Sequence, residues 1–240
     1  MTEAVAFVPG HVTGFFSAHQ DDDPTKAGSR GAGVALADGV TVRLEPGDGV
    51  ELNGEACDLE AVDRVLEALR STARVVVETD LPLSAGFGVS GAAALGTALT
   101  ANAVFDHGLS ENELVTVAHG AMDGIPATRD VEYLTLGELS TADVLAGDTA
   151  ELNEAGRRAL SALVAEPTLE TFMHVSRRFA READLLTPEV QAVIEDVSGA
   201  GEEASMAMLG ETVFALDAGL SDAGYDAERC SVSLAGAHLQ

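Results

Sequence analysis

The chain has 240 residues, of which 46% are hydrophobic, enough to bury the core of one large domain or two small ones. Forty acidic residues against 13 basic ones give a net charge of −27, which repels nucleic-acid phosphates and argues against nucleic-acid binding. The sequence has no run of 18 apolar residues, so we expect no membrane span. The N-terminus does not read as a secretory signal, which predicts a cytoplasmic protein.

The first third of the chain predicts two strands, a hairpin and a helix. Residues 4–8 read as a short apolar strand, and Gly10 to Gly33 as mostly loop, with a turn at Asp21–Pro24. Val34 to Glu45 reads as a hairpin that turns at Asp38-Gly39. Apolar residues at helical spacing predict a helix over Asp58–Arg70 with Asp58 as its N-cap, and a β-branched run predicts a buried strand over Arg74–Thr79.

The middle of the chain predicts a glycine-containing loop followed by helices. After the loop at 80–89, an alanine- and leucine-rich helix is expected over Ser90–Phe105. Ser110 and Glu113 form a capping box that starts a helix running to about His119. Val131–Leu136 is a candidate strand, and Ser140 is expected to cap a short helix.

The last third is mostly helical, with expected helices at 149–164, 168–183 and 188–197. Ala204–Leu216 predicts two short strands around Leu209-Gly210, and Ser231–Leu234 a last strand. This order of elements predicts an α+β fold with two lobes, residues 1–140 and residues 141–240.

The segment Pro82-Leu83-Ser84-Ala85-Gly86-Phe87-Gly88-Val89-Ser90-Gly91 carries the most specific chemistry. A strand leads in and a helix leads out, and Gly86 and Gly88 let the backbone approach a ligand. The first N–H groups of the helix form an anion site suited to a polyphosphate. The Ser90 hydroxyl is a hard oxygen of the kind that Mg²⁺ prefers.

Other interpretations of this segment remain. It lacks the Gly-Lys-Ser/Thr of a Walker A loop, and its context does not suit the first βαβ unit of a dinucleotide fold. A glycine-rich turn before a buried helix would give the same pattern.

A second cluster, near the N-terminus, suits a small hydroxy acid. His11, Thr13, Ser29 and Arg30 gather an imidazole, two hydroxyls and a guanidinium between glycines, and an arginine grips a carboxylate in bidentate fashion. Alternatively, Arg30 forms a structural salt bridge, His11 is a buried structural histidine, and Thr13 and Ser29 cap turns. Two flanking features have alternatives of their own. Lys26 assists phosphate binding or is solvated, and Asp21–Asp23 form a solvated acidic loop.

Together, these segments resemble the archaeal pantoate kinases, a branch of the GHMP kinase superfamily. The spacing Pro-x-x-x-Gly-x-Gly-x-Ser-x-Ala is similar to the ATP-phosphate loop of that superfamily, with Phe87, Val89 and Gly91 departing from its usual form. Val8-Pro9-Gly10-His11-Val12-Thr13-Gly14 resembles its first motif, and Gly28–Gly33 strengthens the match. A third glycine-rich motif would lie at Met208-Leu209-Gly210, where a plain hairpin turn is the alternative.

The resemblance implies a two-lobed kinase that uses ATP and Mg²⁺ to phosphorylate pantoate, a step toward coenzyme A, and it is compatible with a homodimer. Pantoate would lie against His11, Thr13, Ser29 and Arg30, and Mg²⁺ at Ser90. The implied ATP-binding residues are Pro82, Ser84, Ala85, Gly86, Phe87, Gly88, Val89, Ser90 and Gly91.

One family segment has no counterpart. The loop Thr-Gly-Leu-Gly-Asp, whose Asp is taken to act on the attacking hydroxyl, should follow Ala118-His119, but Ile125-Pro126 comes almost at once. This predicts an internal deletion near residue 120 that leaves the catalytic acid unknown, and Asp123 does not match the motif. A non-catalytic relative that binds nucleotide or a partner, and a kinase of another hydroxy acid, are the alternatives.

The remaining composition bounds the setting. Lys26 is the only lysine, and the acid excess predicts a chain adapted to high salt, since at about 1 M salt the Debye length is only ~3 Å. Two isolated cysteines, Cys57 and Cys230, predict no disulfide framework, and six scattered histidines predict no protein-held transition metal.

Overall fold

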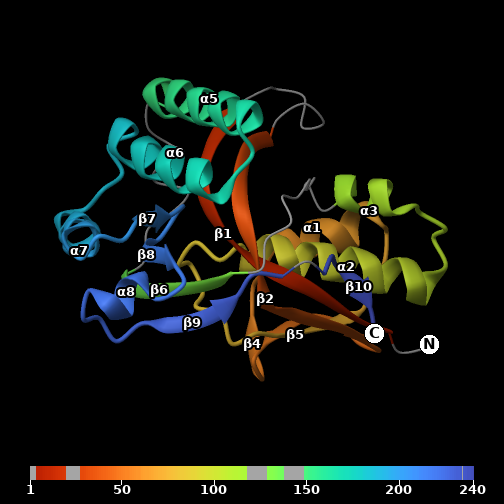
Figure 1. The fold of residues 1–240 in the computed structure, drawn as a ribbon. Coiled ribbons are helices and arrows are strands. Elements are labelled where there is room, and N and C mark those ends of the chain that lie inside the picture. Colours follow the sequence, from red (N-terminus) through yellow and green to blue (C-terminus); the bar gives the residue numbers. More distant parts are fainter. Residues whose placement is uncertain (1–3, 20–27, 118–128, 138–148, 234) are drawn as a thin grey trace.

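A computed structural model of the chain describes residues 4–19, 28–117, 129–137, 149–233 and 235–240. Its helices pack against two sheets, one of six strands in the order β10-β1-β2-β5-β3-β4 and one of four in the order β7-β8-β6-β9 (Figure 1). This mixed arrangement confirms the predicted α+β class. Among the described residues, none of the helices combines the length and apolarity needed to cross a membrane.

The bounds of the elements follow the chain. The strands are β1 Ala4–His19, β2 Gly28–Glu45, β3 Val50–Leu52, β4 Glu55–Cys57, β5 Arg74–Glu78, β6 Asp130–Gly137, β7 Ala204–Ala207, β8 Glu211–Leu216, β9 Glu228–Ser231 and β10 His238–Leu239. The helices are α1 Glu60–Ala68, α2 Val89–Phe105, α3 Glu111–Val117, α5 Ala150–Ala165, α6 Leu169–Glu182, α7 Pro188–Gly199 and α8 Gly219–Asp222.

A long β1–β2 hairpin is the main departure from the sequence prediction. The two strands pair from Ala4↔Leu44 to His19↔Gly28, so the hairpin predicted at Asp38-Gly39 is wrong, and so is the predicted loop over residues 10–19 and 28–33. The turn predicted at Asp21–Pro24 lies outside the described residues. The glycines argue against strands in a sequence pattern because glycine is depleted in strand interiors, yet here the close approach of the paired β1 backbone requires it. A Cβ at Gly31 would stand 2.2 Å from the Phe15 carbonyl oxygen. Gly39 pairs with Pro9 beside a register shift and makes no turn.

Helix α2 packs against one face of the six-stranded sheet, where it contacts mainly β1 and β2 (Figure 1). Its predicted extent is confirmed to within one residue. Helix and sheet approach closely at Gly96, where a Cβ would lie 2.5 Å from Val42 Cγ2. Thr97 and Thr100 are fully buried, and each hydroxyl donates to a carbonyl one turn back at 2.8 Å, which satisfies both groups inside the core.

The β1–β2 hairpin also enters the second half of the molecule, where α5 and α6 cover its far end (Figure 1). Phe15 contributes to an aromatic cluster there, with ring-centroid distances of 6.3 Å to Phe172 and 6.4 Å to Phe179. Phe172 in turn lies 6.1 Å from Phe214 of β8. The buried apolar residues of both sheets therefore form one continuous core.

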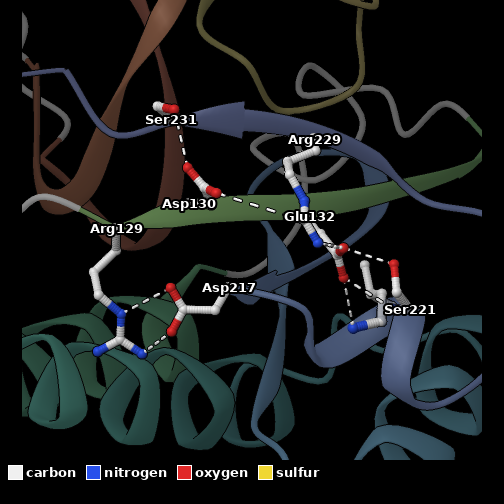
Figure 2. Close-up of polar contacts among 8 residues, drawn as sticks. Arg129, Asp130, Glu132, Asp217, Ser221, Arg229 and Ser231 are labelled. Atoms are coloured by element: carbon white, nitrogen blue, oxygen red, sulfur yellow. Dashed lines mark hydrogen bonds and ion pairs between the residues drawn. The ribbon is translucent and has the colours of Figure 1, made fainter.

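A buried carboxylate ties the second sheet to α8 (Figure 2). Glu132 of β6 has 1% of its side chain exposed and accepts from the backbone N–H groups of Leu220 and Ser221 at 3.1 and 2.9 Å. The Ser221 hydroxyl and Arg229 Nη2 also donate to it, at 2.6 and 2.5 Å. Burial raises the pKa of this carboxyl, but the hydrogen bonds from Arg229 and Ser221 outweigh it, so the pKa lies below its ordinary value.

The remaining elements give a mixed outcome. The capping box is confirmed, since both the N–H and the hydroxyl of Ser110 donate to Glu113, at 2.9 and 2.6 Å. The three predicted helices of the last third and the strand pair β7–β8 are confirmed too. The Asp58 cap is wrong, because α1 begins at Glu60 without a side-chain cap.

The last strand predicted over Ser231–Leu234 is wrong, because β9 ends at Ser231 and β10 follows at His238–Leu239; Leu234 itself lies outside the described residues. The helix expected at Ser140 lies outside the described residues.

Candidate functional site

The loop between β5 and α2 leaves the start of a helix uncapped. Gly88 precedes α2 in the left-handed conformation, with φ +67°, and no side chain caps the helix. The first helical bond runs from the Ala92 N–H to the Gly88 carbonyl at 3.0 Å. Within the described chain, the N–H groups of the first turn before Ala92 have no hydrogen-bond partner, so this helix end offers donors and a partial positive charge to an anion.

The side chains of the loop divide between the core and the surface. Ala85, Phe87 and Val89 are buried, and the Phe87 ring packs edge-on against Tyr133 at a centroid distance of 4.7 Å. Ser90 and Gly91 are exposed, and no described atom lies within 4 Å of the place where a Gly91 Cβ would stand. The apolar side chains thus anchor the loop from below, while the first turn of α2 stays open above.

Phe87 and Val89 explain two of the departures from the superfamily pattern. Their side chains fill the core beneath the loop and do not enter the anion site. Of the other loop residues, Pro82 is half-buried and Ser84 is exposed with φ +55°, next to Gly86 with φ +92°. Three residues in the left-handed region within five positions bend the backbone sharply around the open helix end.

Two distant segments pack against this loop. The N–H of His11 in β1 donates to the Phe87 carbonyl at 3.1 Å. Gly210, in the turn between β7 and β8, is so close that a Cβ there would lie 2.3 Å from the Ala85 carbonyl carbon. The Met208 N–H donates to the Thr13 carbonyl at 2.7 Å, which joins β1 to the same turn. Met208-Leu209-Gly210 is therefore a hairpin turn, as the plainer interpretation had it, and it also braces the loop.

His11 presents a neutral imidazole at the open helix end. Its half-buried ring lies against Gly88, and a Cβ at Gly88 would stand 2.0 to 2.6 Å from three ring atoms. Burial lowers the pKa of His11 below 6.5, so the ring is uncharged at neutral pH and has one donor and one acceptor nitrogen.

The other predicted substrate residues do not form one cluster with His11. Thr13 lies beside it on β1, opposite Gly33. Arg30 and Ser29 lie opposite Ser17 and Ala18. Ser17 is four strand residues or ~13 Å beyond Thr13, and six or ~20 Å beyond His11. A substrate that contacts both groups would have to lie along the hairpin.

Arg30 itself is exposed, and its guanidinium has no ion-pair partner in the described part of the chain. The salt-bridge alternative thus finds no support there. Lys26, Asp21–Asp23 and Asp123 lie outside the described residues.

No group of three or more His, Cys, Asp or Glu side chains is arranged to hold a metal ion within the ranges described. Near the loop, the Ser90 hydroxyl is an exposed oxygen at the first turn of α2. In many proteins, most of the ligands of a Mg²⁺ ion are water molecules and substrate phosphates rather than protein side chains. A single protein hydroxyl therefore suits a Mg²⁺ ion that arrives with a polyphosphate.

The chain is similar to known proteins along nearly its whole length. The GHMP kinases N terminal domain family matches residues 58–131, which span the loop and α2. A pantoate kinase of Methanocaldococcus jannaschii is 30% identical over 88% of this chain and 91% of its own. One of Thermococcus kodakarensis is 31% identical over 88% and 86%. A homoserine kinase of Halorubrum lacusprofundi is 28% identical over 85% and 74%.

The alignment with the Methanocaldococcus jannaschii relative is longer than this whole chain, 250 positions against 240 residues. Because only 88% of the chain takes part, positions of the relative face gaps here. Such gaps agree with the predicted internal deletion, whose expected place near residue 120 falls outside the described residues.

Solved structures give the same fold. A structure described as a phosphotransferase related to the CoA biosynthesis pathway has a TM-score of 0.83 and 28% identity, and the match covers 100% of this chain and 99% of that one. A mevalonate pyrophosphate decarboxylase from Streptococcus pyogenes reaches 0.74 over 97% of both chains at 11% identity, a likeness of fold only.

Proposed function

Because the chain belongs to the archaeal pantoate kinase family of the GHMP kinases, we propose that it transfers the terminal phosphate of ATP to a hydroxyl of pantoate. The structural observation that supports this proposal is the open N-terminus of α2, which has no side-chain cap and follows a loop bent at its glycines. The pantoate kinases of Methanocaldococcus jannaschii and Thermococcus kodakarensis exceed the homoserine kinase both in identity to this chain and in the share of their own length that the match covers. Pantoate is therefore preferred to another hydroxy acid as the acceptor.

In this proposal, the ATP phosphates lie on the backbone N–H groups at Gly88 to Gly91, with Pro82 to Phe87 forming the bend that exposes them. Mg²⁺ bound with ATP would contact the Ser90 hydroxyl and neutralise charge on the transferring group. Its presence also matters for binding, because a chain of net charge −27 repels free ATP.

Pantoate would approach from the β1–β2 hairpin. His11 of this hairpin contacts Gly88 and Phe87 of the loop, which supports a role for it where the acceptor hydroxyl meets the phosphate, and its neutral ring would accept a hydrogen bond from that hydroxyl. Thr13 would add a second polar contact. Arg30, further along the hairpin and without an ion-pair partner in the described ranges, would take the carboxylate.

Positioning and electrostatic stabilisation supply most of the rate acceleration in enzymatic phosphoryl transfer. A chain without the family's aspartate loop therefore keeps the main source of its catalysis. Loss of general-base help costs typically ~10²- to 10⁴-fold. We therefore expect slow but specific turnover. The proposal also includes two lobes that divide at residue 140. It further includes a homodimer and a location in the cytoplasm.

The test uses the purified full chain in molar KCl with ATP, Mg²⁺ and pantoate, and follows the new phosphate monoester by ³¹P NMR. Pantoate should be phosphorylated with a kcat/KM at least about tenfold above those of homoserine and mevalonate, since unpaired polar groups penalise the wrong acceptor. Binding of ATP by calorimetry without any product would instead support the non-catalytic alternative. Light scattering on the same sample measures the oligomeric state.

A further inference from the structure

A cavity of about 200 Å³ lies between α6 and α7, in a part of the molecule remote from α2 (Figure 1). Arg177 and Arg181 line it from α6, and Gln191 and Glu195 from α7. Asp184 lines it from the connection between the two helices. The lining thus carries charges of both signs, two guanidinium groups from α6 and carboxylates from α7 and from the connection.

The arginines of this cavity are not engaged with carboxylates. Arg177 Nη2 donates to the Ser198 hydroxyl at 2.5 Å, and its Nε is buried without a partner. Arg181 has no ion pair among the described residues. By contrast, Arg178 of the same helix donates to Glu182 at 2.7 Å, as most of the described arginines do with some acid. In a chain so rich in acids, two arginines that line one cavity without a carboxylate partner in the described ranges call for an explanation.

The carboxylates of the cavity also have no arginine partner among the described residues. Glu195 accepts from Gln191 Nε2 at 2.7 Å, which fixes its carboxylate on the α7 side. Neither Glu195 nor Asp184 comes within ion-pair distance of Arg177 or Arg181. The cavity is therefore lined at the surface by charges of both signs that form no ion pair with one another, with Arg177 partly buried and Arg181, Asp184 and Glu195 exposed.

We propose that this cavity binds a small zwitterion of the free amino acid class. Its carboxylate would lie against Arg177 and Arg181, whose forks suit a carboxylate, and its ammonium group against Glu195 and Asp184. The volume is below the ~300–1,000 Å³ of typical ligand pockets, which restricts the ligand to a small side chain. A zwitterion also escapes the repulsion that a protein of net charge −27 exerts on anions.

The probes are L-alanine, propionate and ethylamine, measured against the full chain in molar KCl by saturation-transfer NMR and calorimetry. Alanine carries both charges, propionate only the carboxylate and ethylamine only the ammonium. Alanine should bind at least about tenfold more tightly than either half-probe, since each lacks one charge-assisted contact. Equal binding of propionate and alanine, or no binding of alanine, would overturn the proposal.

Two variants of the cavity test the assignment, and a third variant outside it is the control. Arg181→Gln and Glu195→Gln should each weaken alanine binding by about tenfold or more, while Arg178→Gln, next to the cavity but paired with Glu182 outside it, should leave binding unchanged. Thermal unfolding of each variant establishes that it folds. Unchanged binding in both cavity variants would contradict the assignment. The measurement is of binding alone, so it stands or fails independently of kinase activity.

Discussion

The ring of His11 lies so close to Gly88 that a Cβ atom at Gly88 would stand 2.0 Å from His11 Cε1. This approach joins the hairpin to the first turn of α2, and the His11 N–H donates to the neighbouring Phe87 carbonyl at 3.1 Å. The residue proposed to meet the acceptor hydroxyl and the residue proposed to bind phosphate are thus fixed against each other. Both a side chain at position 88 and a missing ring at position 11 should disturb phosphoryl transfer.

Gly88→Ala should abolish most activity. The new methyl group overlaps the imidazole, and φ +67° costs a non-glycine residue about 1–3 kcal/mol of strain. A displacement of about 1 Å at a reacting centre lowers the rate by ~10²-fold, so kcat/KM for pantoate should fall at least that far. Gly199→Ala is the control, because no described atom lies within 4 Å of its Cβ position and its activity should be unchanged. Full activity in Gly88→Ala would refute this geometry.

His11→Gln should lower kcat/KM by about 10- to 100-fold, the effect of one lost hydrogen bond in a partly buried site. The matched control is His174→Gln on the exposed side of α6, which should be silent. An intact pH–rate profile with full activity in the His11 variant would exclude His11 from the site.

The His11 ring should also titrate below 6.5 by NMR, since burial lowers its pKa. Between the folded-state pKa and 6.5, the unfolded chain binds the proton and the folded chain does not. The stability from this residue is therefore complete above pH 6.5 and is lost as the pH falls through the folded-state pKa. A ring that titrates above 6.5 would contradict the buried neutral imidazole.

Ser90 offers a test of the proposed Mg²⁺ contact. Ser90→Ala removes the hydroxyl from the first turn of α2 and should raise the Mg²⁺ concentration needed for half-maximal rate, with a loss of activity of about tenfold. Ser90→Thr keeps the hydroxyl and should retain the wild-type Mg²⁺ dependence. Since Ser90 is exposed, both variants should unfold within about 0.5 kcal/mol of the parent. An identical Mg²⁺ dependence in Ser90→Ala would remove the residue from the metal site.

The loop and its helix were predictable because their signals are local. Gly86 and Gly88 permit the bend, and the apolar run after Ser90 predicts the helix, so no knowledge of distant residues is needed. The β1–β2 hairpin could not be read in this way. Gly31 and Gly33 are required where the paired β1 backbone approaches closely beside a register shift, and this long-range contact cannot be seen in the local pattern, which predicts a loop.

The bracing of the loop by Gly210 was equally hidden. That contact joins residues more than a hundred positions apart, and only the close approach to Ala85 explains the glycine. Arg30 is a different case. Its residue type predicted carboxylate binding, but its distance from His11 follows from the strand register, which depends on bulges between Pro9 and His11 and between Thr13 and Phe15.

Glu132 predicts a specific loss of stability (Figure 2). Glu132→Gln removes the charge that accepts from Ser221, Leu220 and Arg229, and should cost about 2 kcal/mol. Arg129→Gln breaks the ion pair between Arg129 and Asp217, whose side chains are 39% and 53% exposed respectively. This loss should cost less than about 1 kcal/mol of stability. Thermal and urea unfolding measure both, and equal losses would contradict the difference in burial.

The pH dependence of that loss has a defined sign. The pKa of Glu132 is lower in the folded protein than in the unfolded chain, so its stabilisation is complete above the unfolded value of about 4.5. It is lost as the pH falls through the folded-state pKa. The parent should therefore lose stability more steeply than Glu132→Gln in acid, and parallel curves would refute the lowered pKa.

The acid excess predicts that the folded state requires salt. With a net charge of −27, the compact chain repels itself at low ionic strength, and that repulsion fades as the Debye length falls from ~10 Å at 0.1 M to ~3 Å at 1 M. The thermal midpoint should therefore rise steadily as KCl is raised from low to molar concentration. A variant that changes Glu67, Glu166 and Asp226 to lysine provides the control, because all three are exposed and have no ion pair among the described residues. Its salt response should be shallower than the parent's. A parent midpoint independent of KCl would show that self-repulsion does not limit the stability of this fold.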